Sequence, residues 1–198
     1  MPRSGLAARQ RLLQAALDLF QEHGFDRTTT AQIARRAGVT ERTFFHHFPD
    51  KREVLFGGQE HLRDLLRSAV RDAPGELSPL DVLLKAFQSL HEVMEDSRSY
   101  LQQRQQLIAA TPALREREVA KLAYLADELT EALQEHAIPH QPAALAGHTA
   151  AAAFNIAASA WLADPTEPLN ARLASAFEDL RFICTEQRSK DSERPANR

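Results

Sequence analysis

The chain has 198 residues, of which 43% are hydrophobic and 26% are charged, and this balance excludes a wholly disordered protein. A single Cys excludes an internal disulfide, and no segment approaches the roughly 18 consecutive apolar residues of a membrane span. We therefore expect a protein of the reducing cytoplasm that does not bind membranes. Ala and Leu are abundant and Gly is rare, so local propensity predicts an all-α fold.

The net charge of −3 is unevenly distributed. Residues 1–56 contain nine Lys and Arg against six Asp and Glu, a net charge of +3, whereas the remainder contains 15 against 21, a net charge of −6. Basic segments attract the phosphates of nucleic acids. The asymmetry therefore indicates a small N-terminal part that meets phosphates and a larger part that does not.

The first two of about nine predicted helices lie in the basic segment. Apolar residues recur at helical spacing over 6–23, and Gly24 then supplies a helix stop. Thr29, followed three residues later by Gln32, forms a capping-box pattern that predicts a second, short helix. This helix is expected to end at Ala37–Gly38.

A third short helix follows directly. The Thr40 hydroxyl can cap the free backbone amides at its start, and Pro49 prevents the preceding residue from being helical. Two short helices therefore flank a turn at Gly38–Val39. This is the geometry of a helix-turn-helix, in which the second helix lies in the major groove of DNA.

Longer helices are predicted in the acidic remainder. Asp50 with Glu53 gives a capping pattern for a helix that reaches Arg71 and is interrupted early by Gly57–Gly58. A loop precedes Ser78–Pro79, which begins the next helix. Later helices are expected over 97–110, 111–136, 142–163 and 168–186.

The two short helices have a buried and an outward set of side chains. The spacing predicts a small core of Ile33, Ala34, Ala37, Val39, Phe44 and Phe48. It leaves outward Arg42, Thr43, Phe45, His46 and His47. A solvated helix face is the alternative interpretation of the outward set, although two exposed His beside a Phe are unusual for such a face.

The same segment resembles the DNA-binding head of the TetR (tetracycline-repressor-like) family almost position for position. The resemblance is carried by Gly24-Phe25, Thr28-Thr29, the run from Ile33 to Thr40 and the run from Thr43 to Leu55. It implies an all-α protein with a three-helix DNA-binding head over 1–56 and a ligand-binding and dimerisation body over 57–187. Residues 188–198 are polar and are expected to form a disordered tail.

The resemblance also implies which residues contact DNA. These are Thr29, Thr40, Arg42, Thr43, Phe45, His46, His47 and Lys51. Arg42 is the expected base reader, because a guanidinium can bind guanine O6 and N7 together. Phe45 stands where the family more often has Tyr, so it can contact a thymine methyl but donates no hydrogen bond. No contact is assigned to Glu41.

Other classes of function fit the sequence less well. A metal site at His46 and His47 is disfavoured because adjacent helical residues point about 100° apart, so neither a metal nor a cofactor is expected. An enzyme would need a nucleophile with its base, paired carboxylates or a metal cluster, and none occurs at convincing spacing. A purely structural helical protein would leave the pattern from Thr29 to Lys51 unexplained.

The last two predicted helices are candidates for a homodimer interface. The helix over 143–163 is rich in Ala, and small side chains allow neighbouring helices to approach closely. The resemblance implies a two-fold, four-helix interface between this helix and the last one. In the last helix it would use one stripe, Leu169, Leu173, Phe177 and Leu180. The alternative is that these residues form the core of a monomer.

The body is expected to enclose a mainly apolar pocket for a small hydrophobic effector, either a long acyl chain or an aromatic compound. Its candidate lining residues, each of which could instead be plain core, are Leu62, Phe87, Leu90, Met94, Tyr100, Leu107, Leu125, Phe154, Asn155 and Trp161. The expected function is that of a repressor that leaves a palindromic operator when the effector binds. Gly57–Gly58 is either a flexible joint between head and body or a site of close packing.

Overall fold

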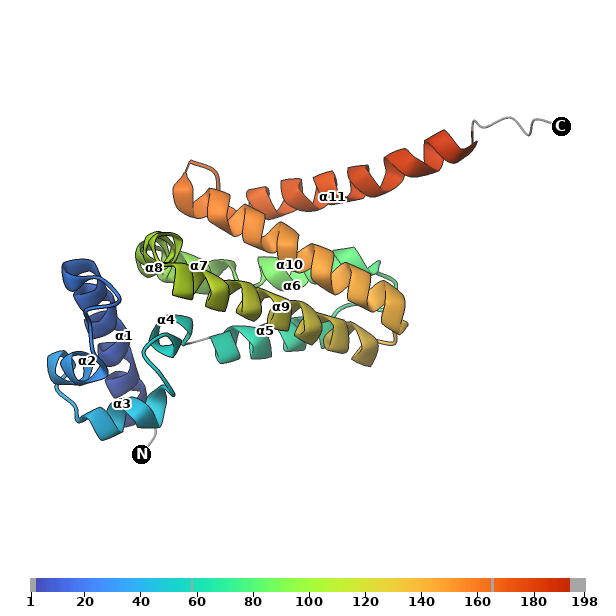
Figure 1. Cartoon of the computed structure of the whole chain (residues 1–198). Coiled ribbons are helices and arrows are strands. Elements are labelled where there is room, and N and C mark those ends of the chain that lie inside the picture. The colour runs from blue at the N-terminus through green and yellow to red at the C-terminus, as the bar shows by residue number, and fades with distance from the viewer. Residues whose placement is uncertain (1–2, 58, 165, 193–198) are drawn as a thin grey trace. The chain divides into compact units, whose positions relative to one another are not determined.

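The structure, a computed structural model, describes residues 3–57, 59–164 and 166–192, and within them every regular element is a helix (Figure 1). The elements are α1 (Arg3–His23), α2 (Thr30–Arg36), α3 (Glu41–His47), α4 (Glu53–Phe56), α5 (Gln59–Arg71), α6 (Pro79–Gln88), α7 (His91–Asp96), α8 (Arg98–Ala110), α9 (Pro112–Glu135), α10 (His140–Ala163) and α11 (Leu169–Ser192). The all-α prediction is thereby confirmed.

Two predicted helices are divided in the structure. The helix expected from Asp50 to Arg71 is α4 followed by α5, because Gly57 takes an extended conformation, with φ −67° and ψ 139°, that ends α4. The helix that begins at Pro79 is α6 followed by α7. At the end of α6 the Ser89 hydroxyl donates to the Ala86 carbonyl at 2.7 Å.

The C-terminal end also differs from the prediction of a tail. Helix α11 continues to Ser192, so the first five residues of the expected disordered segment 188–198 are helical, and 193–198 lie outside the described residues. The side chain of the single Cys, Cys184, lies outside them as well.

The described residues form two compact units. The N-terminal unit consists of Met1–His61 and Ser99–Ala120, and the C-terminal unit consists of Leu62–Arg98 and Lys121–Arg198. The N-terminal unit therefore contains, besides the head expected over 1–56, most of α8 and the first part of α9. Ile108 of α8 and Leu114 of α9 are buried in the same core as the head helices.

The C-terminal unit is built around α10, which packs against α6 and α11. On α6, Phe87 stacks on Phe154 of α10 with ring centroids 4.5 Å apart. Small residues let α9 approach α10 closely: a Cβ added to Gly147 would lie 2.8 Å from the Ala126 carbonyl oxygen. The Ala-rich sequence of α10 is thus used for packing inside the subunit.

The stripe on α11 that was expected to face a second subunit also packs inside this one. Leu169, Leu173 and Phe177 are completely buried in the single chain, so the monomer-core alternative holds for them. Leu180 is half-buried. Within the part of the chain that the structure describes, no helix is long and apolar enough to cross a membrane.

Candidate nucleic-acid interface

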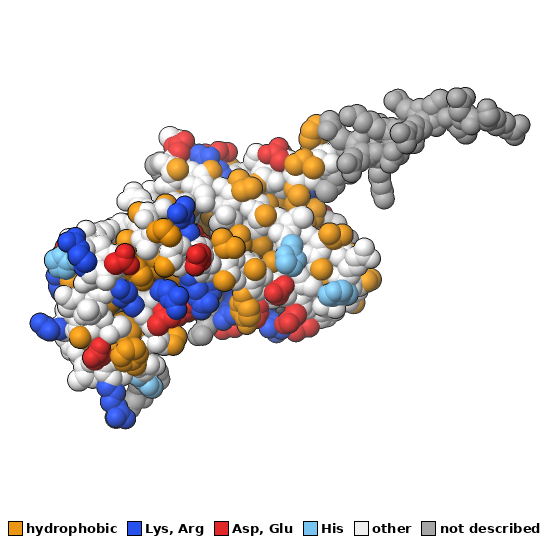
Figure 2. Space-filling model, in the orientation of Figure 1, with side chains coloured by type: hydrophobic (Ala, Val, Ile, Leu, Met, Phe, Trp, Pro, Cys, Tyr) orange, Lys and Arg blue, Asp and Glu red, His pale blue; other side chains and the backbone are white. Residues whose placement is uncertain are grey.

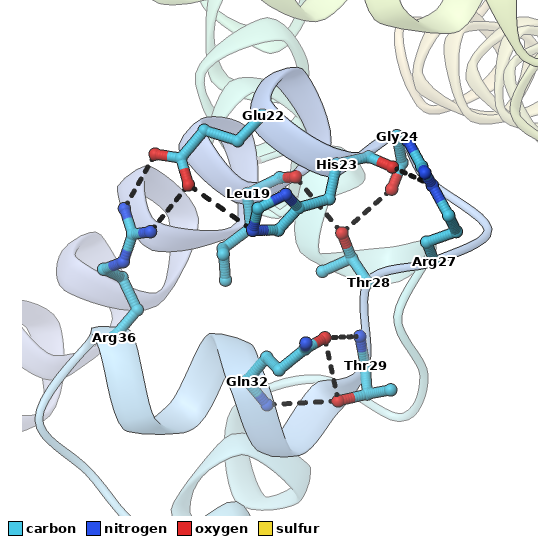
Figure 3. Close-up of polar contacts among 9 residues, drawn as sticks. All are labelled: Leu19, Glu22, His23, Gly24, Arg27, Thr28, Thr29, Gln32 and Arg36. Atoms are coloured by element: carbon cyan, nitrogen blue, oxygen red, sulfur yellow. Dashed lines mark hydrogen bonds and ion pairs between the residues drawn. The ribbon is translucent and has the colours of Figure 1, made fainter.

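Thr29 is the N-cap residue immediately before α2 and forms the capping box that the sequence predicts (Figure 3). The backbone amide of Gln32 donates to the Thr29 hydroxyl at 3.2 Å, and the backbone amide of Thr29 donates to the Gln32 side-chain oxygen at 2.8 Å. These bonds satisfy backbone donors that a helix start otherwise leaves free. Thr29 remains exposed, so its hydroxyl is accessible to a phosphate.

Polar contacts fix α2 on α1. Arg36 donates two hydrogen bonds to the Glu22 carboxylate, at 3.0 and 2.7 Å. The buried Thr28 hydroxyl contacts the carbonyls of Leu19 and Gly24 at 3.2 and 2.9 Å, just before α2 begins (Figure 3). These contacts set the orientation of the first short helix.

The turn between α2 and α3 requires glycine. Gly38 has φ +69°, a left-handed conformation that other residues adopt only with strain. Its amide donates to the Arg35 carbonyl at 3.1 Å, which closes the end of α2. The helix-turn-helix geometry predicted from the sequence is present.

Helix α3 has one buried and one exposed face. Thr40 caps it by accepting from the Thr43 amide at 3.1 Å. Phe44 is completely buried and packs on Phe48, with ring centroids 5.7 Å apart. Because this side of α3 is held in the core, its other side is presented to solvent. Of the predicted contact residues, Arg42, Phe45 and His46 are exposed, and Thr43 and His47 are half-buried.

The exposed face of α3 carries a cationic side chain, Arg42, and a large apolar ring, Phe45. Arg42 makes no hydrogen bond or ion pair with any other described residue, so its guanidinium is available to a ligand. Phe45 is 52% exposed and contacts Phe44 edge-on, with centroids 5.4 Å apart. The rings of His46 and His47 lie 5.3 Å apart. Partial burial lowers the pKa of His47, and the charges of His46 and Arg9 lower it further.

Lys51 has a structural role that the sequence did not reveal. Its ammonium donates to the carbonyls of Phe25 and Thr28, at 2.7 and 2.9 Å, and lies 4.2 Å from the centroid of the Phe25 ring. Burial lowers the pKa of Lys51, although Asp26 opposes this effect. Two of the three donors of the ammonium are thus used to hold the segment that leads into α2.

A second structural feature that sequence reasoning missed is a pair of arginines that hold α4. Arg104 of α8 donates to the Leu55 carbonyl at 2.7 Å, and its guanidinium lies 4.9 Å from the centroid of the Phe56 ring. Arg117 of α9 donates to the Glu53 carboxylate. No short-range pattern could have identified these partners, because they are 49 to 64 residues apart in sequence.

The predicted pocket residues are divided between the two units. Tyr100 and Leu107 pack against the core of the N-terminal unit. In the C-terminal unit, Asn155 is exposed. The remaining members are buried or half-buried in that unit: Leu62, Phe87, Leu90, Met94, Leu125, Phe154 and Trp161.

The buried Trp161 is the centre of a polar cluster in the C-terminal unit. Its indole N–H donates to Glu95 at 3.1 Å, and its carbonyl accepts from Arg98 at 2.6 Å. The Arg98 guanidinium also lies 4.6 Å from the Trp161 ring centroid. Among the described residues, no three His, Cys, Asp or Glu are grouped so that they could hold a metal ion.

Comparison with known families agrees with this geometry. The family model for bacterial regulatory proteins of the tetR family matches residues 12–56. A second model, the MftR C-terminal domain, matches residues 77–182, which is more than half of the chain. The chain belongs to the TetR family. TetR-family proteins are transcriptional regulators, so the α2–α3 unit is the helix-turn-helix of this family.

Curated relatives match only part of the chain. TcmR of Streptomyces glaucescens is 34% identical over 82 residues, which are 41% of this chain and 36% of that protein. BetI of Klebsiella pneumoniae strain 342 is 40% identical over 72 residues, which are 35% of this chain and 37% of that protein. The matched segments thus span about a third of the length of these relatives.

Solved TetR-type structures extend the likeness to most of the chain. A Thermus thermophilus FadR in complex with lauroyl-CoA has a TM-score of 0.56 and 28% identity, covering 86% of this chain and 91% of that one. SmeT in complex with triclosan has a TM-score of 0.60 and 24% identity, covering 87% and 88%. NalD of Pseudomonas aeruginosa has a TM-score of 0.52 and 23% identity, covering 89% and 95%. The last two show the fold alone.

Proposed function

We propose that this TetR-family protein is a repressor that binds a palindromic operator as a homodimer through α3 and leaves it when a small hydrophobic molecule binds its C-terminal body. The observation that carries the proposal is the division of α3 into a face fixed in the core by Phe44 and a face that exposes Arg42, Phe45 and His46. A helix anchored in this way can enter the major groove as a rigid element.

Some of the exposed residues suit contacts to DNA phosphates, and others suit contacts to bases. The hydroxyls of Thr29 and Thr40, at the starts of α2 and α3, suit phosphate oxygens. Arg42 suits guanine and Phe45 suits a thymine methyl. In this proposal Lys51 acts less as a phosphate contact than as a support for the segment before Thr29, because it is already bonded to two carbonyls.

The exposed apolar residues of α10 and α11 support the homodimer. Leu145 and Ile156 of α10 are 63% and 66% exposed, and Phe182 and Ile183 of α11 are 62% and 65% exposed. Figure 2 shows hydrophobic side chains at the surface of the C-terminal unit. Two heads joined in this way would combine their binding energies on two half-sites, about 34–36 Å apart or a multiple of this spacing.

The effector is proposed to be apolar because the core of the C-terminal unit is made largely of apolar residues. Phe87 and Trp161 are completely buried there, and Phe87 stacks on the half-buried Phe154. FadR and SmeT, which share the fold, bind lauroyl-CoA and triclosan respectively. An acyl chain and an aromatic compound are therefore the two classes to test first.

The full-length protein can test the proposal with a random pool of duplex DNA. A palindromic sequence should be enriched, and its affinity should fall as salt increases because phosphate contacts release counterions. Adding lauroyl-CoA or triclosan should release the DNA if either class is the effector, and native mass spectrometry should then detect the bound molecule. Failure to enrich any duplex would contradict the proposed function.

A matched control variant tests whether α3 determines the preferred DNA sequence. Arg35 of α2 is exposed like Arg42 but lies outside the recognition helix. Arg35→Ala should keep the selected sequence, whereas Arg42→Ala should relax it at one position per half-site. If both variants select the parental sequence with equal strength, α3 does not read bases through Arg42.

A further inference from the structure

Glu41 is held in a fixed position at the start of the recognition helix. It is the first residue of α3 and is exposed. The hydroxyl of Thr30, the first residue of α2, donates to the Glu41 Oε1 atom at 2.5 Å. One short hydrogen bond thus joins the first turns of the two helices and restricts the rotamer of the carboxylate.

This carboxylate is unusual on a surface that meets DNA. Among the described residues no cation pairs with Glu41, and its other oxygen, Oε2, has no hydrogen-bond donor. Near phosphates a negative side chain opposes binding. A carboxylate is also an acceptor only, so it cannot donate to a phosphate oxygen. Phosphate contact is therefore excluded as its role.

Base recognition fits the position and the chemistry. The N-terminal residues of a recognition helix are those that contact base edges in a helix-turn-helix. In the major groove cytosine presents an N4 amino donor, whereas guanine presents two acceptors and thymine presents an acceptor and a methyl group. Adenine presents an amino donor beside the N7 acceptor, which repels a carboxylate. Only cytosine offers a donor without an adjacent acceptor.

We propose that Glu41 is a specificity-determining residue that accepts a hydrogen bond from the N4 amino group of one cytosine in each half-site, and that Thr30 is its positioning residue. This inference rests on the proposed function, since it assumes that α3 binds operator DNA. The Thr30 hydroxyl fixes Oε1, which leaves Oε2 to meet the base.

The test compares Glu41→Gln with the parent protein in the random-duplex selection. The glutamine oxygen has two lone pairs, so it can accept from both Thr30 and adenine N6, which retains the fold, while the glutamine NH2 group donates to adenine N7. The selected base should change from cytosine to adenine at one position. On matched duplexes, the affinity ratio between the cytosine and adenine operators should fall by roughly 5- to 150-fold.

Two further variants separate base reading from structural support. Glu41→Ala should lose the preference for cytosine without gaining one for adenine. Thr30→Val should weaken the preference at that same position and leave the other positions unchanged. Asp26→Asn is the matched control, since it removes an exposed head carboxylate outside α3 and should not change the ratio.

The outcomes distinguish the two proposals. If the parent enriches no duplex, the proposed function fails and this inference fails with it. If the parent enriches a palindrome and Glu41→Gln enriches the same one with the same ratio, DNA binding stands and base reading by Glu41 is overturned. A change confined to thermal stability, or spread over all base positions, would likewise assign Glu41 a structural role only.

Discussion

Arg117 of α9 donates from Nε to the Glu53 carboxylate of α4 at 2.5 Å, although the two residues are 64 positions apart. The Glu53 side chain is only 14% exposed, so water screens this ion pair weakly. With Arg104 bonded to the Leu55 carbonyl, both ends of this short helix are held by residues outside the head sequence. Helix α4 therefore depends on α8 and α9 for its position.

This ion pair should contribute to stability more than an exposed one does. In a double-mutant cycle of Glu53→Gln and Arg117→Gln, we expect a coupling energy of roughly 0.5–3 kcal/mol from thermal or denaturant unfolding. The exposed pair of Glu22 and Arg36 is the control and should show weaker coupling, because water surrounds both of its partners. Equal coupling in the two cycles would contradict the role of burial.

Gly57 should resist substitution because its position is crowded. A Cβ there would lie 2.8 Å from the Phe48 ring and 2.7 Å from the Arg9 guanidinium. The Arg9 end can move, but Phe48 is fixed in the core, so we expect Gly57→Ala to destabilise the protein by roughly 1–3 kcal/mol. Gly75, which has nothing within 4 Å of an added Cβ, is the control.

The effect of Gly57→Ala on stability distinguishes a flexible joint from close packing at the Gly57–Gly58 pair. A joint inside a helix would become more stable on substitution by Ala. Gly57 lies outside a helix and is packed closely, which favours the packing role for this residue. Gly58 lies outside the described residues. A rise in melting temperature for Gly57→Ala would contradict the packing interpretation.

Arg42→Ala and Lys51→Ala should affect different properties. Arg42→Ala should leave the melting temperature unchanged and reduce base preference at one position by roughly 1–3 kcal/mol. Lys51→Ala removes the donor of two carbonyls and should cost about 1–3 kcal/mol of folding stability. Unfolding curves and binding isotherms on matched and mismatched duplexes test both. Identical behaviour of the two variants would contradict this division.

The dimer proposal predicts opposite results at two adjacent alanines of α10. Ala152 is exposed on the side of Leu145 and Ile156, whereas Ala153 is only 7% exposed in the single chain. Ala152→Glu should split the dimer and leave a folded monomer, because an unpaired charge in an apolar interface is costly. Ala153→Glu should instead destabilise the subunit.

Sedimentation and circular dichroism distinguish these results. Ala123→Glu is the control, since it places the same charge on an exposed part of α9. An unaltered dimer for Ala152→Glu would place the interface elsewhere.

The lowered pKa of His47 predicts that stability rises with pH. Partial burial disfavours its protonated form in the folded state, so the unfolded chain binds more protons between the lowered pKa and the ordinary value of about 6.5. The contribution is complete above about 6.5 and is lost as pH falls through that interval. His47→Asn should therefore reduce the loss of melting temperature between pH of about 7.5 and 5.5. If the melting temperature of His47→Asn falls as much between these pH values as that of the parent protein, His47 is not the source of the pH dependence.

The sequence by itself determined the helix-turn-helix, because the interactions that define it are local. The Thr29 and Gln32 capping box joins residues three positions apart, and Gly38 supplies its turn through its own backbone freedom. The burial of Phe44 follows from helical spacing. Such interactions can be read from a short window of residues, and together with the family resemblance they indicated the class of function.

Only the tertiary structure decided which partners distant side chains take. The family resemblance implies that Lys51 contacts DNA, yet its ammonium is bonded to the carbonyls of Phe25 and Thr28. Leu173 has the spacing of an interface stripe, yet it is completely buried inside one subunit, in which α11 packs against α6 and α10. Helical spacing predicts which face of a helix is apolar, but it does not predict which other helix covers that face. This choice depends on how segments far apart in the chain pack together.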